Sequence, residues 1–289
     1  MKTIEATHKL RTANPLVAAF GLAVLASAIS TAPARAGNDI SVGGEYSLSI
    51  AGIPFAKGSL SMAIKGDLYA ARAKIATWGV ARLVVESNSY VESSGHFGGS
   101  KVRPAKYSMD SQTKEFNTLV RMRLSGGAIR DLSARPSLRA LPDRVPVKSR
   151  HKANILDPLS AAIVPYRRSG GTLGADACNK TLPIFDGWTR FDVKLHFRKF
   201  AEVNSDGYTG KAVVCGARWV PVAGHRLNKQ TVVYLQENKD LEAWLIPVAG
   251  SNFLVPYRMS IKTKSGTLLI QNKRLVVTGA GAAKKHARK

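Results

Sequence analysis

Apolar and polar residues alternate along most of the chain with a period of two, which is the pattern of antiparallel strands with one buried and one solvated face. Between Glu115 and Gly127, the apolar side chains from Phe116 to Leu124 alternate with polar ones such as Arg121. The same pattern predicts further strands at EYSLSI (45–50), SLSMAI (59–64), VVYLQE (232–237), EAWLIPV (242–248), VPYRMSIKTKSG (255–266) and TLLIQNKRLVVT (267–278).

Two segments are predicted to be helical instead. They are WGVARLVVES (78–87) and LDPLSAAIVPY (156–166), where Asp157 suits the N-cap, Pro158 the first turn and Pro165 the end. The Pro- and Arg-rich residues 133–152 are predicted to form a long loop or crossing segment. The sequence therefore predicts a mostly β fold: one large curved antiparallel sheet, a half-barrel or open barrel, with one or two short helices.

One hairpin can be placed in register from the sequence. Ser205-Asp206-Gly207 suits a three-residue loop with Gly in the left-handed position, between TRFDVKLHF (189–197) and YTGKAVVCGARWV (208–220). Centring the hairpin on Asp206 brings apolar residues together, which is what fixes a register. The pairs expected are Phe197 with Cys215, Leu195 with Ala217, and Val193 with Trp219.

The chain has two cysteines, Cys178 and Cys215, and we expect them to form a disulfide. If residues 178–185 formed a third strand, Cys178 would lie about 10 Å from Cys215, whereas a disulfide needs Cα atoms within about 7 Å. Pro183 also disfavours an inner strand. The segment is therefore expected to leave the sheet and cross its concave side as a clasp. Zinc is the alternative, but the spacing of the cysteines with His196 and His225 matches no compact ligand pattern.

The first 36 residues have the organisation of a cleaved signal peptide. A basic stretch precedes the uncharged PLVAAFGLAVLASAIS (15–30), and Ala34-Arg35-Ala36 suits signal peptidase. A membrane anchor is the alternative, but the apolar core of about 14 residues is shorter than the roughly 20 that a span needs. We expect residues 1–36 to be removed, residues 37–278 to form a single β-rich domain without a transmembrane span, and residues 279–289 to be a basic flexible tail. The predicted location is periplasmic.

The charge is strongly positive, at +24 for the whole chain. Export argues against nucleic acid as the partner, and favours an anionic envelope lipid or polymer, or an envelope protein. Arg190, Lys194, His196 and Arg198 share one face of a predicted strand and are the candidates for anion binding. A solvated sheet face is the alternative reading of this ladder.

Few residues indicate chemistry. The sequence has no G-x-S-x-G elbow, P-loop, H-E-x-x-H or calcium loop, so we expect no enzymatic activity, no catalytic residues, no metal and no cofactor. Phe197, Trp219 and Trp244 are the candidates for lining an apolar pocket, although aromatic residues of this kind are mostly part of a core.

Several motifs carry a resemblance. The set LDPLSA, C-x4-P-x-FDG-x-x-R-x-D, GYTGKAVVCGARWVPVAGH and AWLIPVAGSNFLVPYRMSIKTKSG resembles an uncharacterised proteobacterial envelope family, domain of unknown function 3108. The resemblance covers nearly all of the chain after residue 36. It implies a periplasmic or envelope location and no established activity. The long strands with short helices are also similar to the open half-barrel of lipoprotein carriers, as a fold-level analogy.

Two functions remain. In the first, a curved sheet binds a lipid or acyl chain, or another anionic envelope component, with cations holding the headgroup. In the second, the protein is a structural envelope factor that contacts cell wall, lipopolysaccharide or a protein partner without an internal ligand. An apolar hollow of a few hundred Å³ would favour the first, and a packed core the second.

Overall fold

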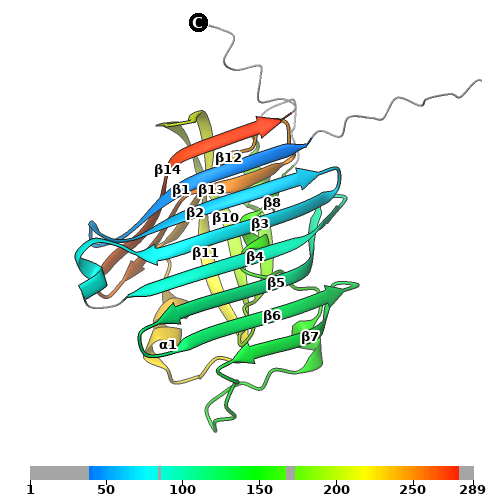
Figure 1. The fold of residues 1–289 in the computed structure, drawn as a ribbon, viewed down its shortest axis with the longest axis vertical. Helices are drawn as coiled ribbons and strands as arrows, with labels where there is room; N and C mark the ends of the chain where they lie inside the picture. Colours follow the sequence, from blue (N-terminus) through cyan, green and yellow to red (C-terminus); the bar gives the residue numbers. More distant parts are fainter. Residues whose placement is uncertain (1–38, 84–85, 167–172, 280–289) are drawn as a thin grey trace, which may run out of the picture. The chain divides into compact units, whose positions relative to one another are not determined.

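A single antiparallel sheet dominates the computed structural model, which describes residues 39–83, 86–166 and 173–279 (Figure 1). Its order is β7-β6-β5-β4-β3-β2-β1-β14-β13-β12-β11-β10-β9, and β8 pairs with β13 outside this path. The strands are β1 (Ile40–Ile50), β2 (Ile53–Lys65), β3 (Leu68–Thr77), β4 (Ser87–Gly98), β5 (Lys101–Thr113), β6 (Asn117–Ser125), β7 (Ala128–Arg135), β8 (Val164–Pro165), β9 (Lys180–Phe185), β10 (Arg190–Ser205), β11 (Tyr208–Ala223), β12 (Leu241–Pro247), β13 (Phe253–Thr263) and β14 (Gly266–Gly279).

The described residues contain little helical structure. The 3-10 helices are η1 (Gly79–Leu83), η2 (Ser149–Lys152), η3 (Ser160–Ala162) and η4 (Ala175–Cys178), and the α-helix is α1 (Gln230–Glu237). None of these described helices has the length and apolar character needed to cross a bilayer. The predicted fold class, an open curved sheet with short helices, is confirmed.

The sheet curls so that its two halves share a core. Val42 of β1 and Met62 of β2 belong to the same buried cluster as Ile246 of β12 and Val255 of β13. In β1 and β2 the buried residues occupy alternate positions, so the period-two pattern places them on the concave face, whereas β12 and β13 bury consecutive residues such as Leu245 and Ile246. Burial of this face is the main stabilising contribution of the fold, at about 25 cal/mol for each Å² of apolar surface removed from water.

The curled sheet is not closed, because β7 and β9 end the strand order without pairing with each other. Residues 153–156, which we call the strap, bridge the gap. The Asn154 amide donates to the Gly127 carbonyl (2.6 Å), next to β7. The Leu156 amide donates to the Pro183 carbonyl (2.7 Å), and the Leu156 carbonyl accepts from the Phe185 amide (2.9 Å), both in β9. The strap therefore joins the two ends of the sheet through backbone hydrogen bonds.

A buried polar cluster follows the strap. Asp157 and Ser160 are fully buried, and the Asp157 carboxylate accepts from the backbone amides of Leu159 (3.0 Å) and Ser160 (2.8 Å). It also accepts from the hydroxyls of Ser160 and of Ser93 in β4. The Tyr69 hydroxyl of β3 shares a 2.7 Å hydrogen bond with the Ser160 hydroxyl. Asp157 caps a turn as predicted, and the same carboxylate ties this turn to the concave face of the sheet.

The predicted helix at 156–166 is wrong in extent. Only Ser160–Ala162 are helical, and Val164–Pro165 pair with β13. Contacts with the surrounding sheet replace the intrahelical hydrogen bonds that a longer helix would make. The predicted helix at 78–87 is a 3-10 turn over Gly79–Leu83, before β4 begins at Ser87.

The hairpin of β10 and β11 has the predicted register. Phe197 pairs with Cys215, Leu195 with Ala217, and Val193 with Trp219. The loop is one residue shorter than expected, because Ser205 pairs directly with Tyr208. A β-bulge between Phe197 and Lys199 adds a residue back to β10, so the apolar pairs still meet.

Two other local predictions are wrong. Residues 232–237 belong to α1, where the Tyr234 hydroxyl donates to the Lys262 carbonyl of β13 (3.1 Å). A short apolar run is ambiguous between strand and helix, and tertiary contacts decided it here.

Residues 180–185 form β9 rather than leaving the sheet. Pro183 is tolerated because β9 is the edge strand of the order, where one side needs no ladder.

Candidate functional site

A cleft of about 560 Å³ lies between the strap, the start of β5 and the edge strand β9. Its apolar lining includes Val102 of β5, Ile155 and Leu156 of the strap, Ile163, and Leu182 of β9. Three cationic residues, Lys101, Arg103 and Lys180, also line it. The site therefore combines an apolar wall with positive charge contributed by two strands far apart in the sequence.

Alternation in β5 explains how one strand supplies both kinds of residue. Val102 is 8% exposed and belongs to the shared core, whereas Lys101 and Arg103 on either side of it are exposed. Lys180 is half-buried at the first position of β9, opposite Leu195. The cations thus lie where the strands reach solvent, and the apolar side chains continue inward.

A second hollow of about 800 Å³ adjoins the cleft and shares Ser100 and Pro165 with it. Its apolar lining includes Ile64, Phe97 and Phe253. The rings of Phe97 and Phe253 stack with centroids 5.6 Å apart, which joins β4 to β13 across the concave face. The two hollows therefore lie at the same end of the curled sheet.

The electrostatics of the cleft are one-sided. Among the described residues, no carboxylate lines either hollow, and none lies within ion-pair distance of Lys101, Arg103 or Lys180. Cations without an internal counter-ion favour an anionic ligand group at the rim.

The four predicted anion-binding residues of β10 (Arg190, Lys194, His196 and Arg198) differ in whether they already form an ion pair within the protein. Arg190 lies 2.7 Å from Asp192, and the two side chains are 12% and 21% exposed, so this pair is partly desolvated. Arg198 lies 3.3 Å from Glu242 of β12 and donates to the Lys239 carbonyl (3.0 Å). Arg190 and Arg198 therefore already have partners within the protein.

The other two members, Lys194 and His196, are exposed on β10. A Cβ atom at Gly216 would lie 2.2 Å from the His196 ring and 2.6 Å from Arg198 Nε, so this glycine gives both side chains room to lie across β11. Anion binding by the ladder stays a prediction, and among the described residues these two members have no ion pair with a carboxylate.

The predicted pocket aromatics line neither hollow. Phe197 is 40% exposed, and its ring lies 5.0 Å from that of Phe200. Trp219 is half-buried beside Phe191, with ring centroids 5.8 Å apart.

Trp244 is also half-buried and packs against the shared core. Its indole N–H donates to the Glu242 carboxylate, and the Arg258 guanidinium lies 5.4 Å from the ring centroid. The ring therefore contributes to packing and to a cation–π contact.

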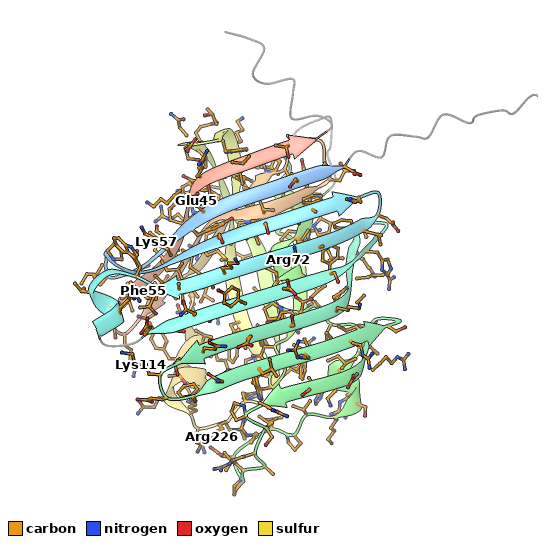
Figure 2. The ribbon with its side chains drawn as sticks, viewed as in Figure 1. Glu45, Phe55, Lys57, Arg72, Lys114 and Arg226 are labelled. Atoms are coloured by element: carbon orange, nitrogen blue, oxygen red, sulfur yellow. A yellow bond between two sulfur atoms is a disulfide. The ribbon has the colours of Figure 1, made fainter. Side chains whose placement is uncertain are left out.

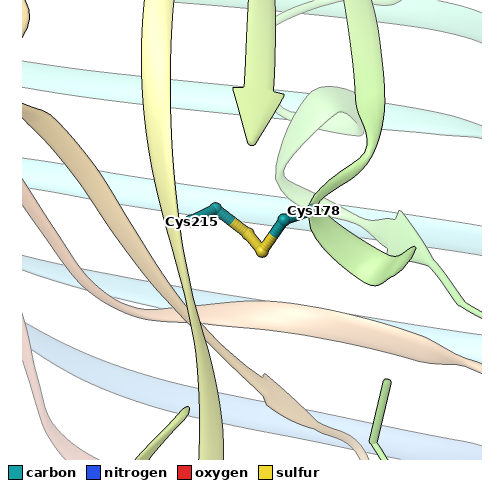
Figure 3. Close-up of a disulfide and its surroundings, with 2 residues drawn as sticks. All are labelled: Cys178 and Cys215. Atoms are coloured by element: carbon teal, nitrogen blue, oxygen red, sulfur yellow. A yellow bond between two sulfur atoms is a disulfide. The ribbon is translucent and has the colours of Figure 1, made fainter. Parts of the chain in front are cut away.

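The predicted disulfide between Cys178 and Cys215 is present, with Cα atoms 5.3 Å apart (Figure 3). Both cysteines are fully buried, and Cys178 ends the 3-10 helix η4. The clasp is thus the segment before β9, which packs over β11 and holds the start of the edge strand. A structural disulfide is typical of proteins that fold outside the reducing cytosol.

The motif FDG forms a turn that positions β10. The Asp186 carboxylate accepts from the amides of Trp188 (2.8 Å) and Thr189 (2.6 Å) and from the Thr189 hydroxyl (2.6 Å). Gly187 has φ 109°, and a Cβ there would lie 2.8 Å from the methyl groups of Val120 in β6. These residues fix the turn that leads into β10.

Burial shifts the pKa values of the Asp157 and His225 side chains in opposite directions. Burial raises the pKa of the Asp157 carboxyl, and its hydrogen bonds to Ser160 and Ser93 oppose that shift. Burial lowers the pKa of His225, which favours the neutral imidazole. The described residues contain no group of three or more His, Cys, Asp or Glu side chains that could hold a metal ion.

The sequence prediction missed the cleft residues Lys101, Arg103 and Lys180. Their local signal was weak, since KVRP and NKTLP each contain ordinary surface cations. A signal did exist in β5, because Val102 alternates with Lys101 and Arg103 on opposite faces of the strand, whereas Lys180 and Leu182 share one face of β9. The sequence could not predict that the strap would bring β5 and β9 together at the same cleft.

Comparison with known proteins gives a family and no function. None of the curated proteins matches this sequence. A solved structure titled a beta-barrel-like protein of domain of unknown function DUF1849, from Brucella abortus, aligns with a TM-score of 0.47 at 8% identity. The alignment covers 83% of this chain and 98% of that one. A family model described as protein of unknown function (DUF3108) matches residues 45–272. The chain therefore belongs to the DUF3108 family of proteins of unknown function.

Proposed function

We propose that this protein binds an anionic amphiphile, such as a fatty acid or a lipid with one acyl chain in the cleft, and that it acts by binding rather than by catalysis. The observation that carries the proposal is the cleft of about 560 Å³, which has an apolar lining, three cationic residues and no acidic lining residue among those described. Small-molecule sites typically have volumes of about 300–1,000 Å³.

The acyl chain would supply most of the affinity. Each buried CH₂ group contributes about 0.8 kcal/mol, and Val102, Ile155, Leu156, Ile163 and Leu182 offer apolar surface for it. A cation at a solvated rim contributes roughly 0.2–1 kcal/mol. Lys101, Arg103 and Lys180 would therefore orient the headgroup more than they strengthen binding.

An extracytoplasmic location supports the same ligand class. The disulfide is typical of an exported protein, and the predicted signal peptide, which lies outside the described residues, would direct the chain to the periplasm. The cell envelope is where phospholipids and their acyl fragments are concentrated. A periplasmic carrier or sensor of such molecules is the function that the cleft supports best.

Native mass spectrometry of protein purified from an exporting host tests the proposal, with binding of palmitate and of a lysophospholipid to the delipidated protein as the quantitative assay. We expect Lys101→Gln/Arg103→Gln/Lys180→Gln to weaken palmitate binding by about 5-fold or more. Lys199→Gln/Lys211→Gln/Lys264→Gln is the control, since it removes the same charge from exposed residues that do not line the cleft.

A steric variant tests the position of the chain independently of charge. Thr181 is exposed and lines the cleft, so Thr181→Trp should fill it and reduce binding, whereas Thr278→Trp, on β14 outside the cleft, should not. The proposal fails if the wild-type protein carries no amphiphile and binds neither probe. That result would favour a structural envelope factor that contacts wall, lipopolysaccharide or a protein without an internal ligand.

A further inference from the structure

A second feature lies on the surface, at the end of the sheet formed by the β1–β2 turn and η1. Ile53 is 62% exposed, Trp78 is 45% exposed and Val80 is 73% exposed, and we call these residues the apolar tip. The Trp78 amide donates to the Phe55 carbonyl (2.8 Å), which holds η1 against the start of β2. Figure 2 shows Phe55 and Lys57 at this end of the sheet. Large apolar side chains gathered at a solvent-exposed end usually mark a contact surface.

Lysines accompany the exposed aromatic rings. The Lys57 ammonium lies 4.0 Å from the ring centroid of Trp78. On the neighbouring strands, the Lys74 ammonium lies 5.4 Å from the ring centroid of Tyr90, which is 54% exposed. The register places Lys74 opposite Ser59 of β2 and Tyr90 of β4, so the two lysine–aromatic pairs lie near each other.

The charge around the tip is positive. Arg82 and Lys114 both contact Glu86, at 2.8 Å and 3.9 Å, so this carboxylate is shared between two cations. Among the described residues, Lys57 and Lys74 have no carboxylate within ion-pair distance. The tip therefore presents apolar side chains with unneutralised lysines next to them.

We infer that the apolar tip docks on the surface of a bilayer that contains anionic lipid. Trp and Tyr rings prefer the headgroup level of a membrane, and lysine side chains extend from there toward phosphate groups. Aliphatic residues such as Ile53 and Val80, at the end of a turn, can enter the acyl boundary without moving the sheet. Electrostatic attraction adds about 1 kcal/mol for each lysine near an anionic leaflet.

A bilayer fits this surface better than a folded protein does. Protein interfaces centre on packed apolar cores in which charged residues, Lys in particular, are depleted. Here Lys57 lies directly over Trp78, and Val80 protrudes from a five-residue 3-10 turn. Shallow insertion with the lysines in the headgroup layer uses both features together. This inference does not depend on the proposed ligand in the cleft, because the two sets of residues do not overlap.

Flotation with phosphatidylcholine vesicles that contain about one third phosphatidylglycerol tests the inference. We expect the full chain to float with these vesicles and Ile53→Ser/Trp78→Ser/Val80→Ser to lose about 30-fold or more in partitioning. The matched control is Leu68→Ser/Leu227→Ser/Val276→Ser, whose side chains are 58%, 56% and 45% exposed elsewhere.

Two further measurements separate insertion from simple charge attraction. Wild-type tryptophan emission should shift to the blue on vesicle addition, and Trp78→Phe should lose most of that shift. Lys57→Gln/Lys74→Gln should weaken binding to the anionic vesicles and reduce its salt dependence, since screening shortens the Debye length from about 10 Å at 0.1 M to about 3 Å at 1 M. Binding of the Ser triple variant at the wild-type level would overturn the inference, and so would association of the tip with a second copy of the chain in place of vesicles.

Discussion

Asp157 offers the sharpest test of how the fold is held together, because one buried carboxylate fastens the strap to the concave face of the sheet. Asp157→Ala would leave the amides of Leu159 and Ser160 and the hydroxyls of Ser93 and Ser160 without this acceptor. A hydrogen bond contributes about 1 kcal/mol net. Part of the loss is offset, because the desolvation of the carboxylate disappears too. We expect the variant to lose about 3–4 kcal/mol of unfolding free energy.

Asp157→Asn is the matched variant. The amide has nearly the same shape, its oxygen can accept from the two backbone amides, and its NH₂ group can donate to the two serine hydroxyls. We expect its stability at pH 7 to lie within about 1 kcal/mol of the wild type, or above it, because the neutral group avoids the cost of a buried charge. The comparison separates loss of hydrogen bonds from loss of charge.

The pH dependence adds an independent signature. Burial raises the folded-state pKa of Asp157 above its ordinary value of 3.8. At a pH between the two pKa values, the folded protein keeps a proton that the unfolded chain has released. The stabilisation from this site is therefore complete below the ordinary pKa and is lost as the pH rises through the raised, folded-state pKa.

Urea denaturation of the wild type, Asp157→Asn and Asp157→Ala across this pH range provides the measurement. The difference in unfolding free energy between Asp157→Asn and wild type should move in favour of the variant as the pH rises, while other groups cancel. If that difference is flat with pH, Asp157 is not a buried carboxyl with a raised pKa. If Asp157→Ala is within about 1 kcal/mol of wild type, the cluster does not hold the strap, and the argument for its role is wrong.

Two other predictions address the clasp and the FDG turn. Cys178→Ala/Cys215→Ala removes a crosslink between residues separated by 37 positions, and the chain-entropy estimate gives a loss of about 4 kcal/mol. Urea denaturation under non-reducing conditions measures this, and equal stability of the variant and the oxidised wild type would contradict it. Gly187→Ala should destabilise the protein by about 2 kcal/mol or more, because its φ is 109° and the new methyl would lie 2.8 Å from Val120. Gly66→Ala, with φ 60° and no atom within 4 Å of the new Cβ, is the control that isolates backbone strain, and similar losses in both variants would show that contact with Val120 contributes nothing.

Local alternation was enough to determine much of the fold. The register of β10 and β11 was correct because a slip by one residue would turn Leu195 and Val193 away from the core. The disulfide was predicted from the presence of two cysteines in a chain expected to be exported, and the register correctly turned Cys215 toward the buried face. The predicted pairs are correct although the loop is one residue shorter than predicted, because the β-bulge after Phe197 shifts the register back by one residue.

Other features depended on contacts between distant segments. The sequence VVYLQE is compatible with either a helix or a strand, and its helical form in α1 is accompanied by a tertiary hydrogen bond from the Tyr234 hydroxyl to the Lys262 carbonyl. The ion pairing of the cation ladder could not be predicted either, because Glu242, the partner of Arg198, lies on another strand.

The candidate site shows the limit most clearly. The alternating pattern reports which side of a strand is buried, but not which segment covers it or what space is left. Lys101 and Lys180 share a cleft only because the strap bridges the open ends of the sheet through Asn154 and Leu156. The sequence by itself determined the strands β1, β2, β6 and β10–β14, the register of one hairpin and the cysteine pairing, since these follow from local periodicity and residue chemistry. Tertiary structure decided the cleft, because a cavity is the volume that packed segments leave between them.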